Sequence, residues 1–162
     1  MHTKTILSLS LAAALGVAAP LALAADPHHG HEDHHNAEGP AKLTLDHARK
    51  WPTDAPLRDH MSAIRAALAA QLHGIHENTL KPEEFAALGA NVEQRVGRIV
   101  AECKLPAKAD AMLHIVVADL IAGAEAMQGK GDLAPQAGAH KAAMALNAYG
   151  KHFRHPGWKP LK

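Results

Sequence analysis

The sequence predicts an all-α protein, an antiparallel up-down-up-down four-helix bundle that follows a disordered, histidine-rich N-terminal tail. Three observations support this prediction. From residue 51 onward, apolar side chains recur at spacings of three and four, the period of one helix face. Alanine is abundant there and β-branched residues are few, as is typical of helices. Prolines, glycines and acidic residues divide the region into four segments of similar length.

The first two helices carry clear start signals. Thr53 and Asp54 can each cap the first helix, and Pro56 suits its first turn. This helix is expected to run to about Asn78. The second is expected to begin at Pro82, where a proline followed by two acidic residues suits a helix N-terminus. The two apolar faces consist of Leu57, Met61, Ile64, Leu68, Leu72 and Ile75, and of Phe85, Leu88, Val92, Val96, Ile99 and Cys103.

The third helix is expected to follow Pro106 and to stop before the glycines at 129 and 131. The fourth is expected from about Pro135 to Phe153. Their apolar faces consist of Leu113, Val116, Val117, Leu120, Ala124 and Met127, and of Ala139, Ala142, Leu146, Tyr149 and Phe153. Short loops join all four helices, so an antiparallel bundle over residues 51–158 buries these faces most simply. Residues 159–162 are expected to form a C-terminal tail.

In this topology both ends of the bundle chain meet at one pole. Trp51 precedes the first helix and Trp158 follows the fourth, so we expect the two indoles to cover that end of the core. We expect Cys103 to be a buried small apolar residue. A metal ligand or a thiol for an intermolecular bond is the alternative, because an exported chain with one cysteine cannot form an internal disulfide.

Residues 1–24 have the features of a secretory signal peptide. A basic start at Lys4 precedes an uncharged apolar run from Ile6 to Leu23, and Ala22-Leu23-Ala24 forms a small-x-small cleavage pattern. We therefore expect a mature chain that begins at Ala25 and lies in the periplasm without a stable membrane anchor. The apolar run is about long enough to span a bilayer, so an uncleaved anchor is the alternative.

Residues 25–50 hold almost nothing apolar before Leu43 and are predicted to be the disordered tail. Five of its histidines lie within eight residues: His28, His29, His31, His34 and His35. Neutral imidazole suits Cu(II), Zn(II) and Ni(II), and Glu32 and Asp33 add oxygen donors. A flexible strand of this composition can gather three or four donors around one ion, so we predict a metal site here. A solubilising polar linker is the alternative.

The charge balance argues against nucleic acid as a partner. The leader carries Lys4 as its only charged side chain, so its removal leaves 16 of the 17 Lys and Arg against 16 Asp and Glu. A neutral chain with 3% aromatic residues and no basic stripe offers little to a phosphate backbone.

In an antiparallel bundle, residues that are equally far from a connecting loop lie at the same level along the bundle axis. This rule brings further possible ligands to similar levels. Near the tryptophans it places Met61, Met112, His152 and Cys103, a set that suits Cu(I) or haem iron. Methionine as a filler of the core is the alternative.

Near the other pole the same rule places His73, His76, His140 and Met127. A shared metal ion is one interpretation, and solvated surface histidines are the other. We expect His114 to be a hydrogen-bonded, partly buried imidazole, because it lies within an apolar run.

Catalytic patterns are missing from the sequence. It has no glycine-rich phosphate loop, no nucleophile elbow, no His-Glu-x-x-His and no Cys-x-x-Cys-His. Ser62 is the only serine of the expected mature chain, and it falls in the middle of a helix. We therefore expect a protein that is not an enzyme.

Four segments resemble a family of small exported proteobacterial helical proteins that are uncharacterised and sometimes carry the automatic label DnrO-like. These segments are residues 51–58, 109–114, 147–150 and 155–158. The resemblance covers about residues 43–158, leaves the histidine tail outside and implies no activity.

The predicted architecture is also similar to that of the periplasmic b-type cytochrome bundle, whose haem lies between a Met early in helix one and a His late in helix four. The resemblance implies Met61 and His152 as the candidate donors. The position expected for the axial His is Gly150, however, and His152 lies about 200° further around the helix. Haem is therefore not expected.

Together these patterns predict an exported periplasmic protein that sequesters or delivers Cu, Zn or Ni through its tail, with the bundle as a carrier. Two alternatives stay open. One is a haem or redox carrier that uses Met61 and His152. The other is a structural envelope protein that binds a protein partner and no cofactor.

Overall fold

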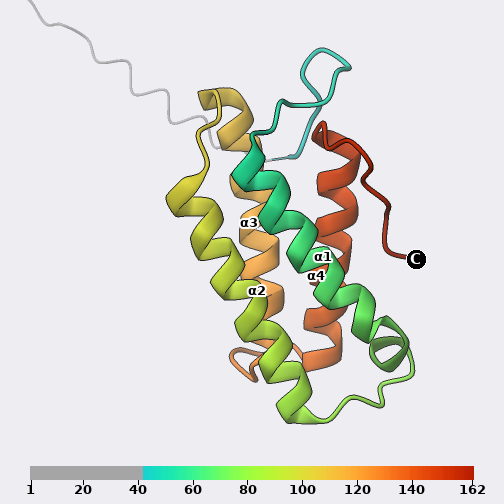
Figure 1. Ribbon diagram of the computed structural model, residues 1–162. Coiled ribbons are helices and arrows are strands. Elements are labelled where there is room, and N and C mark those ends of the chain that lie inside the picture. Colours follow the sequence, from blue (N-terminus) through green and yellow to red (C-terminus); the bar gives the residue numbers. More distant parts are fainter. Residues whose placement is uncertain (1–41) are drawn as a thin grey trace, which may run out of the picture. The chain divides into compact units, whose positions relative to one another are not determined.

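A computed structural model describes residues 42–162, which form four α-helices and no β-strand. The helices are α1 (Ala55–His76), α2 (Pro82–Glu102), α3 (Ala107–Met127) and α4 (Pro135–His152). They run alternately up and down, and α4 returns to pack beside α1 (Figure 1). The prediction of an all-α four-helix bundle is therefore confirmed. The expected leader and the histidine-rich part of the tail lie outside the described residues.

The helices begin and end where local signals place them. The side chain of Asp54 caps α1 by accepting the backbone N–H of Leu57 at 3.0 Å. At its other end α1 stops two residues before the expected Asn78, which adopts a left-handed conformation with φ of 51°. Asparagine tolerates this conformation better than most residues, so it ends the helix in the way a glycine does elsewhere.

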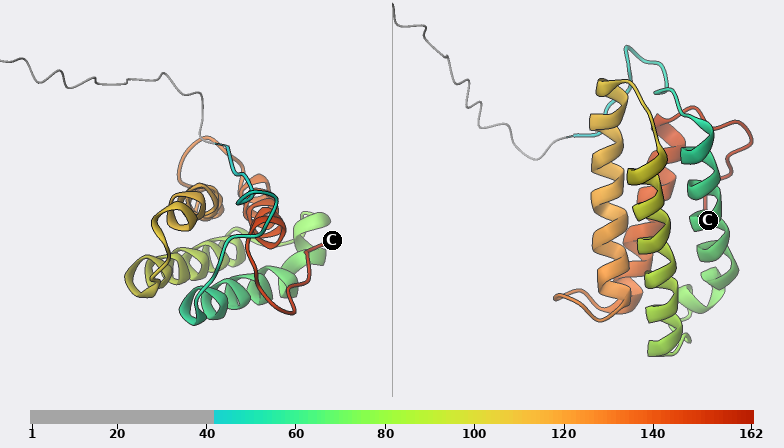
Figure 2. Two further views of the ribbon diagram at one scale, coloured as in Figure 1. Left: turned by 90° about the horizontal axis from the view of Figure 1, so that it is seen from above. Right: turned by 60° about the vertical axis from the view of Figure 1, so that its left-hand side comes forward.

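The core is a continuous apolar cluster to which all four helices contribute. Its largest fully buried side chains are Tyr149, Phe153, Leu57, Met61, Ile64, Leu68, Ile75, Ile99, Leu120, Met127, Leu146 and Val92. Figure 2 shows the helices from above and from the side, with α3 and α4 directly adjacent. Burial of these apolar faces is the main force that holds the bundle together.

Two glycines allow α3 and α4 to approach closely. A Cβ atom added to Gly123 would lie 2.7 Å from the carbonyl oxygen of Gly138, and a Cβ on Gly138 would lie 2.7 Å from that of Gly123. Both distances are far below van der Waals contact, so only glycine fits at either position. The backbones of the two helices thus meet directly at this level.

The segments before α1 and after α4 are joined to each other. The N–H of Trp51 donates to the carbonyl of His152, and the N–H of Arg154 donates to the carbonyl of Trp51, each at 2.8 Å. Trp51 itself is buried in the core. Trp158 is partly buried and packs edge-on against Tyr149, with ring centroids 4.9 Å apart.

Parts of both expected tails also contact the bundle. Leu43 packs against the core from the N-terminal side, although the sequence predicts that residues 42–50 belong to the tail. Leu161 is buried, and its backbone N–H and C=O both bond to the side-chain amide of Asn147. The structural unit thus extends beyond residues 51–158 in both directions, because these two leucines add apolar surface to it.

None of the helices within residues 42–162 is both long enough and apolar enough to cross a bilayer.

Candidate functional site

The five tail histidines, His28, His29, His31, His34 and His35, lie outside the described residues, so the metal site there stays a prediction. Within residues 42–162, no three His, Cys, Asp or Glu side chains converge in a way that would hold a metal ion. The bundle does, however, bring several of the predicted donors into defined surroundings.

His76 and His140 meet across two helices. His76 is the last residue of α1 and is exposed, whereas His140 lies in the first half of α4 and is half-buried. Their imidazole rings stack with centroids 5.6 Å apart and planes 9° from parallel. The structure therefore places these two predicted residues side by side.

The other two donors predicted near this pole are arranged differently. His73 is exposed on α1, three residues before His76. Met127 is buried in the core, so its thioether is not available at the surface. Of the four donors, only the two stacked imidazoles form a pair between helices.

The sulfur donors near the tryptophans belong to the interior. Met61 is fully buried in the core. Met112 is partly buried, and the hydroxyl of Thr44 lies 3.7 Å from its sulfur. His152 donates from Nδ1 to the carbonyl of Ala148 at 2.8 Å, which leaves only Nε2 for any ligand. An ion or a haem would have to displace core side chains to reach Met61.

Asp54 binds the α2–α3 loop as well as capping α1. Its Oδ2 accepts the backbone N–H of Lys104 at 2.6 Å, and the thiol of Cys103 donates to the same carboxylate. Burial alone would raise the pKa of Asp54, but the hydrogen bonds from Lys104, Leu57 and Cys103 outweigh it and lower the pKa below its ordinary value. The carboxylate is thus ionised, and both of its oxygens accept hydrogen bonds that stabilise the fold.

Cys103 is held in its neutral form. Burial raises the pKa of its thiol to about 12, and the negative charges of Asp54, Glu102 and Asp110 act in the same direction. The thiolate is the form that attacks electrophiles and binds metals. A half-buried thiol with so high a pKa is therefore a poor nucleophile and a poor ligand at neutral pH.

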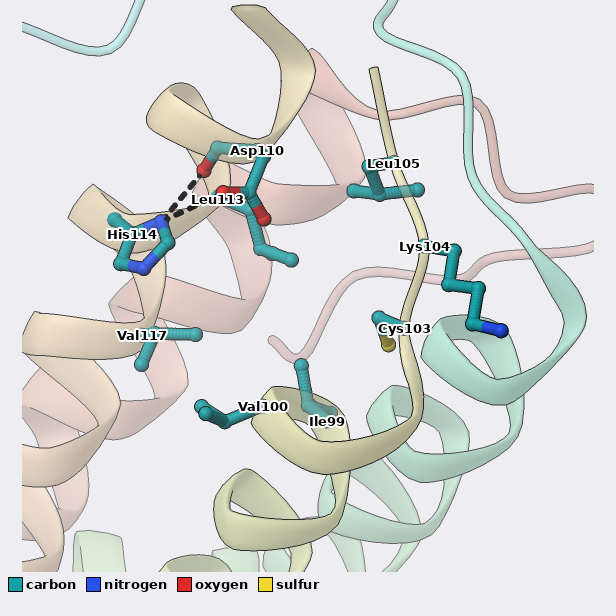
Figure 3. Close-up of a pocket in the computed structure, with 9 residues that line it drawn as sticks. All are labelled: Ile99, Val100, Cys103, Lys104, Leu105, Asp110, Leu113, His114 and Val117. Carbon is teal, nitrogen blue, oxygen red and sulfur yellow. Dashed lines mark hydrogen bonds and ion pairs between the residues drawn. The ribbon is translucent and has the colours of Figure 1, made fainter. Parts of the chain in front are cut away.

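A groove of about 480 Å³ lies beside this cysteine, between the end of α2 and the start of α3. Apolar side chains, including Val100 and Val117, form much of its lining, and Figure 3 shows Cys103 and His114 on opposite sides of it. His114 donates from Nδ1 to the carbonyl of Asp110 at 2.9 Å. Its side chain is 67% exposed, so the expectation of partial burial is wrong although the hydrogen bond is present.

A linked trio of side chains was not expected from the sequence. The hydroxyl of Ser62 on α1 lies 3.2 Å from Nε2 of His155, and the hydroxyl of Tyr149 on α4 lies 3.0 Å from Nδ1 of the same ring. His155 follows α4 in a segment without helical periodicity. A pattern in the sequence that could pair it with Ser62, 93 residues away, is therefore missing.

The proton positions in this trio follow from the buried phenol. Tyr149 is fully buried, and within residues 42–162 its hydroxyl has Nδ1 of His155 as its acceptor. Nδ1 therefore accepts, and Nε2 carries the proton and donates to Ser62. Burial, and next the charge of Arg58, lower the pKa of His155 and favour this neutral ring. A ring nitrogen that already holds a proton cannot take one from Ser62, so the trio lacks the arrangement of a serine nucleophile and its base.

Comparison of the chain with protein-family models, with curated proteins and with solved structures found no match in any of the three.

Proposed function

We propose that this chain is an exported, periplasmic transition-metal-binding protein that sequesters or delivers Cu, Zn or Ni. The tail holds the principal site, and the helical bundle is its carrier. The observation that carries the proposal is the density of donors at His28–His35, where five imidazoles and two carboxylates fall within eight consecutive residues.

The surroundings of the other donors support the tail as the main site. Cys103 is held as a neutral thiol, and Met61 is enclosed by the core. Residues 42–162 contain no group of three ligands that could hold an ion. A chelating set of three or four donors is therefore to be sought ahead of the bundle.

The chemistry of the most reactive groups supports binding rather than catalysis. With Nδ1 of His155 assigned as the acceptor of the Tyr149 hydroxyl, the nitrogen that faces Ser62 carries a proton, and the pKa of Cys103 keeps its thiol protonated. Within residues 42–162, neither residue has an adjacent group that activates it in the way that covalent catalysis requires. The proposal therefore assigns the protein no catalytic step.

Equilibrium titration of the mature protein with Cu(II), Zn(II) and Ni(II) tests the proposal. The comparison is with a chain in which the five histidines of His28–His35 are changed to serine. The matched control replaces three exposed histidines of the described part, His47, His73 and His114, with serine.

We expect loss of the tightest binding event in the tail variant and its retention in the control. Equal, weak uptake by all three proteins would overturn the proposal. Elemental analysis of untagged protein from its own envelope would then identify the ion that is carried under natural supply.

A further inference from the structure

The end of the bundle where α1 finishes and α4 begins holds an ordered pair of imidazoles on two different helices. His76 and His140 stack with centroids 5.6 Å apart. We propose that this pair is a second transition-metal site, which binds Zn(II), Cu(II) or Ni(II) through two imidazoles and leaves the remaining coordination positions to water or to a ligand from a partner. The site is independent of the histidines in the tail.

The separation of the rings matches that of two imidazoles on one ion. A coordinated ion lies about 2.0–2.1 Å from the ring nitrogen, and hence roughly 3.2 Å from the ring centroid. Two rings on one ion then have centroids about 5.2 Å apart at a tetrahedral angle and roughly 6.4 Å apart in a line. The observed 5.6 Å lies between these limits. No change in the distance between the helices is needed.

Only the orientation of the rings has to change. The lone pair of an imidazole nitrogen lies in the plane of the ring, and the two planes are 9° from parallel. Because the rings are stacked, their lone pairs lie in two nearly parallel planes and do not meet at one common point. Because His76 is exposed at the end of α1, its ring can turn until the lone pairs converge.

The backbone beneath the pair is fixed in advance. The side-chain amide of Gln136, one turn before His140 on α4, donates to the carbonyl of Ile75 at 2.8 Å. Ile75 is the neighbour of His76 and is fully buried in the core. The same two helix ends that carry the imidazoles are thus already connected. Binding of an ion therefore costs little conformational entropy of the chain.

The charge next to the pair is also favourable. Lys141 follows His140, but its ammonium bonds to Asp119 on α3 at 2.6 Å. Its cation is therefore neutralised by a partner on α3. A divalent ion at the pair meets no unpaired charge from this lysine.

Two imidazoles with open positions make a weaker site than the full set proposed for the tail. An ion held in this way exchanges ligands readily, because water occupies the other positions. Such a site suits transient occupation by an ion that is passed on, and less well its permanent storage.

The test uses the full mature chain with the five tail histidines changed to serine, so that binding at the pair is measured alone. Thermal unfolding is followed with and without Ni(II) or Zn(II), and Cu(II) binding is followed by electron paramagnetic resonance. We expect the ion to raise the melting temperature by about 5 °C, because it binds the folded chain only. The copper spectrum should show two equivalent nitrogens.

His76→Ala and His140→Ala should each abolish this shift and weaken binding about tenfold or more, since each removes one arm of the chelate. His73→Ala is the matched control and should bind like the parent. A parent chain without any shift or copper signal would overturn the proposal, as would loss of binding in His73→Ala with full binding in His140→Ala.

The folding of His76→Ala and His140→Ala is checked by circular dichroism. His140→Gln serves as a second variant if His140→Ala does not fold. Failure of this site leaves the proposed function untouched, because the tail is tested separately with the pair intact.

Discussion

The carboxylate of Asp54 accepts the backbone N–H of Lys104 at 2.6 Å while its other oxygen caps α1. A single side chain thus fastens the start of the first helix to the loop between the second and third. The fold depends on this residue for contacts that lie 50 positions apart in the sequence.

Replacement of Asp54 by alanine should destabilise the protein by about 1–2 kcal/mol, because it removes a helix cap and leaves the amide of Lys104 without its acceptor. Urea unfolding at pH 7 measures the change. Asp132→Ala, at an exposed carboxylate of the α3–α4 loop, is the control and should be neutral. A neutral Asp54→Ala variant would show that water replaces both bonds without cost.

The same substitution should have opposite effects at Gly138, which lies between α3 and α4, and at Gly97, which lies on α2. Gly138→Ala would place a Cβ 2.6 Å from that of Ala126, so we expect a loss of about 1–3 kcal/mol. Gly97→Ala, on an exposed face of α2 with open space around it, should stabilise the protein by about 0.5–1 kcal/mol. Chemical unfolding of the two variants gives both values. Equal effects would mean that the helices are free to separate.

We expect His155 to make the free energy of unfolding depend on pH. The folded state lowers the pKa of this ring below its ordinary value of 6.5, so the unfolded chain binds the proton more tightly. This contribution to stability is therefore complete above pH 6.5 and is lost as the pH falls through the lower pKa of the folded state. Protonation of Nδ1 would also remove the acceptor of the buried Tyr149 hydroxyl.

Urea unfolding between pH 7.5 and 5 should show a smaller pH dependence in His155→Gln than in the parent. The other histidines are the same in both chains, so their titration cancels in the comparison. Parallel curves for the two proteins would contradict the assignment.

Cys103 should react slowly with thiol reagents. A thiol with a pKa of about 12 has roughly a thousandfold less thiolate at pH 8 than an ordinary cysteine, and its labelling rate should fall in proportion. Asp54→Asn removes one of the charges that disfavour the thiolate, so it should speed the labelling. Modification of the native protein at the rate of a free thiol would contradict this account.

The helices were predictable because their signals are local. Pro82, Pro135 and the cap at Asp54 mark helix starts, and the apolar faces repeat with the helical period. The sequence also predicts that His76 and His140 lie at a similar level along the bundle axis. In antiparallel helices joined by short loops, residues equally far from a loop share one level. The stacking of the two rings did not follow, because it depends on how each helix is turned about its axis.

The contacts outside the helices were not predictable for a different reason. His155 reaches Ser62 through a return of the chain after α4 that has no periodic pattern. The exposure of His114 does not follow from its apolar neighbours in the sequence, because those neighbours are spread around the helix. Leu113 is buried in the core, whereas His114 next to it faces solvent. A helix turns about 100° per residue, and adjacent positions therefore differ in exposure.

The pairing of Trp51 with His152 and Arg154 has a consequence for how the molecule opens. The entry and the exit of the bundle are one hydrogen-bonded unit, and neither can fray while the other stays closed. Strain applied to the chain ahead of residue 51 is transmitted to the last turn of α4. The amides of Trp51 and Arg154 should therefore exchange with solvent together, as a single cooperative event at this pole.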